Sequence, residues 1–213
     1  MIEIQKISDI MQHIDGLKAV IFDLDDTLYN EKEYVFSGYR AVAAILPQVA
    51  DAQMKMQNAF ENNRHAIDEV LTLEGIYTEE LKQRCLEVYR NHFPDIHLND
   101  DVLQVLEQLK MKGYLTGIIT DGRPEGQRMK IKTLGLEKYF DHIIVTDELG
   151  GIEYRKPNTK AFEMMKELLG VEYTEMCYIG DNQKKDFVAP LMLKIKSIHI
   201  VNKDGIYYSE GAV

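Results

Sequence analysis

Short apolar runs rich in β-branched residues recur along the chain and predict the strands of a sheet. Neither face of these runs is consistently polar, which is typical of parallel strands covered by helices on both sides. The runs cover residues 19–22, 115–120, 142–146, 176–180 and 197–201. Amphipathic helical patterns lie at 99–112, after Pro124, from about Asn158 to Leu169, and between Lys184 and Leu193. The alternation predicts an α/β fold with a doubly wound, five-stranded parallel sheet of Rossmann-like type.

The alternation breaks between the first and second predicted strands, where about ninety residues have helical spacing instead. The helical faces cover residues 39–46, 56–71 and 81–92. Pro94 should end the last of these helices. A crossover within a sheet needs only one helix, so three or more predict a helical subdomain inserted into the sheet domain. The expected division places 33–95 in the subdomain and both 1–32 and 96–213 in the core.

Composition limits the function classes. The 213 residues include 25 Lys and Arg against 35 Asp and Glu, a formal net charge of -10. This acidic balance disfavours nucleic acid polymers and anionic membranes, which bind basic surfaces, but it permits a small anionic substrate in a local pocket. Neither a signal-peptide core nor a membrane-length apolar stretch is evident. Together with two separated cysteines, Cys85 and Cys177, these features predict a cytoplasmic protein with reduced thiols. They give no indication of its oligomeric state.

Carboxylates gather directly after the first predicted strand. They belong to Asp23, Asp25 and Asp26, within the sequence FDLDDTLY. Like charges packed at a strand end repel one another unless a cation or a shared proton relieves them, and Mg²⁺ is a natural partner for oxygen ligands. A solvated acidic turn is the simpler alternative. An EF-hand calcium loop is disfavoured, because Leu28 and Tyr34 stand where that loop needs Gly and Glu.

Further polar groups follow the other predicted strands. They are Thr120, Asp121 and Gly122 after the second strand, Lys156 before a later helix, and Gly180, Asp181 and Asp186 after the fourth strand. The Thr120 hydroxyl and the two N–H groups that follow it suit a phosphate cradle at the entry to a helix. Alone, each feature is weak, because such a threonine is usually a helix cap and such a lysine is usually solvated. Their order on alternating strands and helices makes them a candidate site.

In this order and spacing the motifs resemble those of the haloacid dehalogenase superfamily. The matching residues are Asp23, Asp25 and Thr27 (DxDxT), Thr120, Lys156 with Pro157, and Gly180, Asp181 and Asp186 (GDxxxxD). The resemblance covers nearly the whole chain, with residues 1–17 and the tail after 202 least constrained. It implies a haloacid-dehalogenase-like sheet with strand order 5-4-1-2-3, so that the first predicted strand is central. It also identifies the helical insertion as a C1-type cap.

The resemblance implies a role for each matched residue. Asp23 would be the nucleophile that forms an aspartyl-phosphate, and Asp25 would give a proton to the leaving group and take one from water. Mg²⁺ would be held by Asp23, the Asp25 backbone carbonyl and Asp181. The residues implied to hold phosphoryl oxygens are Thr120, Asp121, Gly122 and Lys156, and those implied to support the site are Thr27, Asn182 and Asp186. Asp121 departs from the family pattern, which more often has Asn or another small polar residue there.

These implications favour a Mg²⁺-dependent phosphatase that acts on a small phosphorylated metabolite of nucleotide, flavin mononucleotide or sugar phosphate type. A phosphomutase of the same family stays open as an alternative. A receiver-like signalling module is disfavoured by the large helical insertion. A dehalogenase is disfavoured by Asp25, which serves an oxygen leaving group, and a catalytically silent relative is disfavoured because every expected catalytic residue is present. The sequence does not indicate which phosphomonoester is the substrate.

Overall fold

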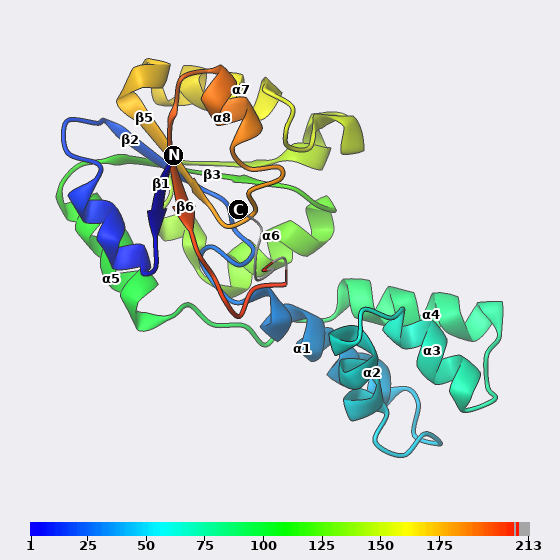
Figure 1. Cartoon of the computed structure of the whole chain (residues 1–213). Coiled ribbons are helices and arrows are strands. Elements are labelled where there is room, and N and C mark those ends of the chain that lie inside the picture. The colour runs from blue at the N-terminus through cyan, green and yellow to red at the C-terminus, as the bar shows by residue number, and fades with distance from the viewer. Residues whose placement is uncertain (207, 209–213) are drawn as a thin grey trace. The chain divides into compact units, whose positions relative to one another are not determined.

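The computed structural model describes residues 1–206 and 208, and the strands among them form one six-stranded parallel sheet (Figure 1). They are β1 (Ile2–Ile4), β2 (Ala19–Phe22), β3 (Leu115–Thr120), β4 (His142–Val145), β5 (Met176–Gly180) and β6 (Lys196–Ile200). Their order in the sheet is β1-β6-β5-β2-β3-β4. The five strands expected from the sequence are present in the expected order. The prediction of a five-stranded sheet was wrong, because β1 adds a sixth strand at the edge beside β6.

Helices alternate with the strands in the part of the chain outside the insertion. They are α5 (Asp100–Met111), α6 (Pro124–Thr133), α7 (Lys160–Leu169) and α8 (Val188–Met192), with short 3₁₀ helices η1 (Ile7–Gln12), η2 (Leu136–Lys138), η3 (Thr146–Leu149), η4 (Ile152–Tyr154) and η5 (Tyr173–Glu175). Gly113 (φ 75°) follows α5, and Gly170 (φ 64°) ends α7, both in the left-handed region that glycine enters without strain.

The central strand, β2, is buried along its whole length. Ala19 pairs with Leu115 of β3 on one side and with Met176 of β5 on the other. Figure 1 shows α7 and α8 over one face of the sheet and α5 and α6 over the other. On the α7 side, Phe162 packs against Tyr178 of β5 with ring centroids 5.0 Å apart. Coverage of both faces explains why β2 carries no alternating polar positions.

The N-terminal segment is part of the core, although the sequence left residues 1–17 as the least constrained region. Ile4 of β1 pairs with Ile200 of β6. In η1, Ile7 and Ile10 are 2% and 0% exposed, and Ile14 beyond it is 0% exposed. A three-residue strand is too short to show a period, which is why the apolar pattern did not reveal it.

The last core helix is shorter than the predicted span from Lys184 to Leu193, because α8 begins only at Val188. Residues 183–187 form turns instead. The Asn182 N–H donates to Asp186 Oδ2 at 3.0 Å, and the Asp186 N–H donates to the Asn182 carbonyl at 2.9 Å. An aspartate side chain that bonds nearby backbone groups in this way competes with helix formation.

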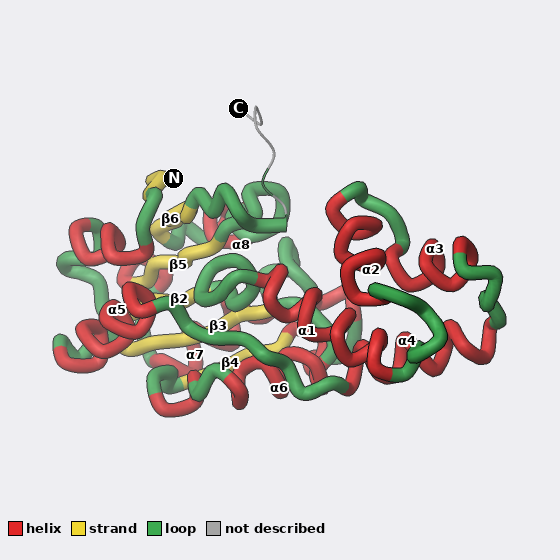
Figure 2. The backbone as a smooth tube through the Cα atoms, turned by 90° about the horizontal axis from the view of Figure 1, so that it is seen from below, coloured by secondary structure: helices red, strands yellow, loops and turns green. Residues whose placement is uncertain are grey.

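The chain divides into two compact units, one formed by 1–31 with 97–213 and the other by 32–96. Figure 2 shows the second unit, which the structure describes in full, as helices and loops. Its helices are α1 (Glu31–Ala44), which begins at the boundary, α2 (Ala52–Glu61), α3 (Ala66–Leu73) and α4 (Glu79–Asn91). The single helix expected over 56–71 is therefore two helices. Asn63 breaks it with a left-handed φ of 55°, a conformation that asparagine tolerates.

The amino end of α4 follows its sequence signal. Thr78 accepts a hydrogen bond from the Leu81 N–H at 3.1 Å, and acidic residues occupy the first turn. The helix ends at Asn91, before Pro94, as predicted. No helix among the described residues combines the length and the hydropathy that crossing a bilayer would need.

Candidate active site

Polar residues converge where three neighbouring strands end. Asp23 follows β2, Thr120 ends β3 and Asp181 follows β5. Because β2 lies between β3 and β5, the carboxyl ends of these parallel strands meet at one edge of the sheet. A cavity of about 310 Å³ opens there. Its walls are formed by Asp23, Asp25, Glu31, Asp121, Arg155, Lys156, Asp181, Asn182 and Lys185.

A buried lysine joins two carboxylates at the base of this site. Lys156 Nζ lies 2.7 Å from Asp23 Oδ1 and 2.8 Å from Asp186 Oδ1, and it donates to the Tyr178 hydroxyl at 2.9 Å. Burial alone would lower the pKa of Lys156, but Asp186 and Asp23 raise it well above its ordinary value. The ammonium therefore stays charged, and its pairing offsets the cost of burying all three charges.

Asp23 is fixed from both its backbone and its side chain. Its N–H donates to the Ile179 carbonyl of β5 at 2.8 Å, and the residue is 2% exposed. Burial raises the pKa of Asp23 to about 6, against the opposing effect of Lys156. With Oδ1 facing Lys156, the second carboxylate oxygen is the one left for a metal or a substrate.

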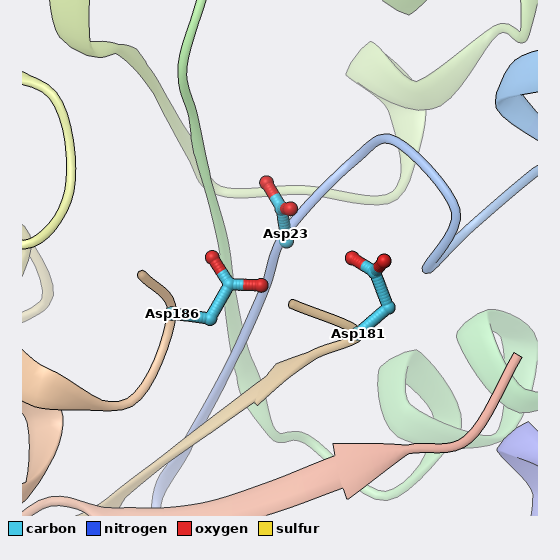
Figure 3. A group of neighbouring side chains, drawn as sticks. All are labelled: Asp23, Asp181 and Asp186. Atoms are coloured by element: carbon cyan, nitrogen blue, oxygen red, sulfur yellow. The ribbon is translucent and has the colours of Figure 1, made fainter. Parts of the chain in front are cut away.

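Three carboxylates at this edge form a group that could hold a metal ion. One oxygen each from Asp23, Asp181 and Asp186 lies within 4.8 Å of the other two, and Figure 3 shows the three side chains grouped together. Burial, followed by the charges of Asp23 and Asp186, raises the pKa of Asp181 to about 8. Within residues 1–206 and 208, no side chain forms an ion pair with Asp181. Three carboxylates with one paired lysine among them offer hard oxygen donors in excess of positive charge, which fits a cation such as Mg²⁺.

Asp25 is held by donors other than Lys156, and the sequence did not indicate them. Lys130 Nζ lies 2.7 Å from Oδ1, the Tyr29 hydroxyl donates to the same oxygen, and Gln127 Nε2 donates to Oδ2 at 2.9 Å. Burial alone would raise the pKa of Asp25, but Lys130 and these hydrogen bonds hold it below its ordinary value.

The segment after β3 contributes the expected cradle residues in a defined arrangement. Thr120 is 0% exposed and accepts a hydrogen bond from Gln127 Nε2 at 2.6 Å. Asp121 Oδ1 accepts from the Thr146 hydroxyl at 2.8 Å and from the Lys156 N–H at 3.1 Å. The extra carboxylate at position 121 therefore ties this segment to the residues after β4 and to the lysine segment. Gly122 has a φ of 139°, a conformation that suits glycine.

Of the predicted supporting residues, Asp186 and Asn182 lie at the site, whereas Thr27 lies inside the loop that follows β2. Asp186 holds Lys156 and closes the turn that begins at Asn182, whose side chain accepts a hydrogen bond from the Lys184 N–H at 3.1 Å. Thr27 is 4% exposed and is not among the residues that line the cavity. Its N–H donates to the Leu24 carbonyl at 3.4 Å, so its place is inside the loop that carries Asp23.

Five charged or amide residues near the site were missed by sequence reasoning. They are Glu31, Gln127, Lys130, Lys185 and Arg155, which lines the cavity and donates to Asp147. Burial, followed by the neighbouring Asp25, raises the pKa of Glu31 to about 8. For Gln127 and Lys130 a signal existed, because polar residues three positions apart occupy the same helical face as Ile131 and Leu134, which are buried. For Glu31 and Lys185 the sequence offered no sign beyond their nearness to the motifs.

Comparison with known proteins assigns the family. The family model described as haloacid dehalogenase-like hydrolase matches residues 20–200. The chain therefore belongs to that family. Among its curated relatives, this hydrolase is 26% identical over 197 residues to the glyceraldehyde 3-phosphate phosphatase of Methanocaldococcus jannaschii, which covers 87% of this chain and 85% of the relative. It is 23% identical over 177 residues to pyrophosphatase PpaX of Bacillus cereus, covering 78% and 75% of the two chains.

Solved structures agree with the family assignment. The crystal structure of a phosphatase of the same superfamily from Thermococcus onnurineus matches with a TM-score of 0.55 and 26% identity, covering 86% of each chain. The parallel sheet, the family and the enzyme class expected from the four motifs are thus confirmed for this haloacid dehalogenase-like hydrolase. The roles of its individual site residues remain predictions.

Proposed function

We propose that this hydrolase is a Mg²⁺-dependent phosphatase that cleaves a small phosphomonoester through an aspartyl-phosphate on Asp23. The observation that carries the proposal is the buried Asp23 carboxylate, paired with Lys156 on one oxygen and adjoining Asp181 and Asp186 in a cavity. The names of its relatives, a glyceraldehyde 3-phosphate phosphatase and a pyrophosphatase, support small phosphorylated substrates.

In this mechanism the chain's own residues carry the bond changes. An Asp23 oxygen forms a bond to phosphorus as the bond to the leaving oxygen breaks, and Asp25 gives that oxygen a proton. Water then attacks the phosphorus of the aspartyl-phosphate, Asp25 takes a proton from it, and phosphate leaves with Asp23 restored. Lys156, the Thr120 hydroxyl and the N–H groups of Asp121 and Gly122 are the donors for the phosphoryl oxygens.

The metal has a place in the same arrangement. Asp23, Asp181 and the backbone carbonyl of Asp25 would hold Mg²⁺, and Asp186 would act by holding Lys156, to which it is already paired. A bound Mg²⁺ offsets the repulsion between the Asp23 carboxylate and the phosphoryl oxygens. The helical unit, 32–96, would act as the C1-type cap and select among nucleotide, flavin mononucleotide and sugar phosphate substrates.

The test is hydrolysis of p-nitrophenyl phosphate with MgCl₂. We expect Asp23→Asn to lower kcat by on the order of 10³-fold or more, because the nucleophile is removed, and EDTA to abolish wild-type activity. Asp15→Asn, at an exposed position outside the cavity, serves as the matched control and should keep wild-type activity. Full activity of the Asp23 variant, or activity that persists in EDTA, would refute the proposal.

A further inference from the structure

Helix α6 buries two polar side chains that no motif explains. Gln127 and Lys130 are each 4% exposed. Being three residues apart, they project from the same face of the helix, where a helix against a sheet normally places apolar residues. An ammonium buried at such a position is costly unless it is paired. The contacts of both residues lead to the candidate active site.

Lys130 fixes one oxygen of Asp25. Its Nζ lies 2.7 Å from Asp25 Oδ1, and the Tyr29 hydroxyl donates to the same oxygen. The Lys130 ammonium also lies 5.9 Å from the centroid of the Tyr29 ring. Two donors from different segments therefore converge on a single carboxylate oxygen, and together they define where the carboxylate points.

Gln127 fixes the second oxygen of Asp25 and also the hydroxyl of Thr120. Its Nε2 donates to Asp25 Oδ2 at 2.9 Å and to Thr120 Oγ1 at 2.6 Å. An amide nitrogen can only donate, so the Thr120 oxygen accepts in this contact. The Thr120 proton is left for another acceptor. The Gln127 side chain is itself packed against Gly122, where an added Cβ would lie 3.2 Å from it.

We infer that Gln127 and Lys130 are positioning residues that hold the Asp25 carboxylate and the Thr120 hydroxyl in the orientations their chemistry requires. The inference rests on the proposed function, in which Asp25 carries the proton and Thr120 binds a phosphoryl oxygen. Neither Gln127 nor Lys130 contacts the phosphoryl group or the leaving oxygen in this scheme. Each acts through a residue that does, and small displacements of such residues are costly to rate.

Leaving-group dependence separates positioning of the acid from a general loss of structure. Phenyl phosphate and p-nitrophenyl phosphate have similar shapes, but phenoxide needs a proton from Asp25 far more than p-nitrophenoxide does. We expect Lys130→Met to lower kcat/KM for phenyl phosphate about 10-fold more than for p-nitrophenyl phosphate, within the range that acid catalysis contributes. The ratio of the two values in one preparation does not depend on the fraction of protein that is folded.

Matched variants complete the experiment. Lys132→Met, at an exposed position of the same helix, should keep the wild-type ratio. Lys130→Arg, which retains a cation, should shift the ratio of the two kcat/KM values less than Lys130→Met does. Gln127→Met should both shift the ratio and weaken competitive inhibition by inorganic phosphate several-fold, because Gln127 alone also orients Thr120.

An unchanged ratio in Lys130→Met and Gln127→Met, whether activity is lost on neither substrate or equally on both, would overturn the inference and leave the proposed function intact. A wild-type protein that hydrolyses neither substrate would overturn both. Unaltered inhibition by phosphate in Gln127→Met would remove the Thr120 part alone.

Discussion

At the scale of single residues, the cations of the cavity are not equivalent. Lys156 is fully engaged, because two carboxylates and a hydroxyl surround its ammonium. Lys185 lines the same cavity, its side chain is 31% exposed, and its Nζ lies 3.6 Å from Asp121 Oδ2. A looser ion pair is easier to exchange for a substrate anion. Of the two cavity lysines, Lys185 is thus the better placed to respond to substrate binding.

Replacing Lys185 by Met should therefore raise KM for a phosphomonoester about 10-fold with a smaller effect on kcat. A hydrogen bond to a charged group contributes about 1.5–3 kcal/mol, and 1.4 kcal/mol corresponds to a factor of ten. Steady-state kinetics on p-nitrophenyl phosphate measure KM and kcat separately. Lys184→Met, at the exposed neighbouring position, is the control. The same rise in KM in both variants would show that Lys185 acts only through the overall charge.

At the scale of elements, the short segments carry as much of the structure as the long helices. β1 and η1 precede the first motif and fill the edge of the sheet with isoleucines. The turns before α8 carry Asp186, which pairs with Lys156. Helix α6 can bury polar side chains because Asp25 and Thr120 accept their hydrogen bonds.

The importance of the N-terminal segment can be measured at Ile10. Ile10→Ala should lower the free energy of unfolding by about 2–5 kcal/mol, because it leaves a cavity beneath a fully buried side chain. Met111→Ala, at a position that is 78% exposed, should change it by less than about 0.5 kcal/mol. Urea unfolding gives both values. Equal stability of the two variants would mean that η1 is not part of the cooperative core.

At the scale of the whole molecule, the sheet gathers more acids at one edge than its cations neutralise. Burial raises the pKa of Asp23 to about 6 and those of Asp181 and Glu31 to about 8. Each of these acids binds its proton more tightly in the folded protein than in the unfolded chain. Folding is therefore favoured by protonation of the site, and this contribution is lost as the pH rises through the folded pKa values.

The metal-free protein should accordingly become less stable as the pH rises from about 5 to about 8, within the window set by these pKa values. Urea unfolding in EDTA across that range measures the slope. Asp181→Asn should flatten it, because one of the raised carboxyls is removed. MgCl₂ should stabilise the wild-type protein, by about 2.7 kcal/mol at 100 times its Kd, and the variant much less. Constant or increasing stability toward pH 8 in EDTA would contradict the burial of these charges.

Local patterns in the sequence were enough to predict most of the strands and helices of this hydrolase. The buried strands followed from apolar runs, because β-branched runs are local in the chain. Their order followed only from the family resemblance that the DxDxT, Thr120, Lys156 and GDxxxxD motifs carry. The helical insertion was visible for the same reason, although Asn63 divided one predicted helix into two.

Only the tertiary structure decided the partners of the charges. The pairing of Asp25 with Lys130 joins residues 105 positions apart, and that of Asp25 with Gln127 joins residues 102 positions apart. No periodicity encodes such contacts, since they depend on how α6 lies against the ends of β2 and β3. The sequence by itself thus determined which carboxylates meet at the sheet edge, through the motifs that end the strands. Tertiary packing determined which cations and amides reach these carboxylates, because the distance between residues far apart in the sequence is set by how their elements pack.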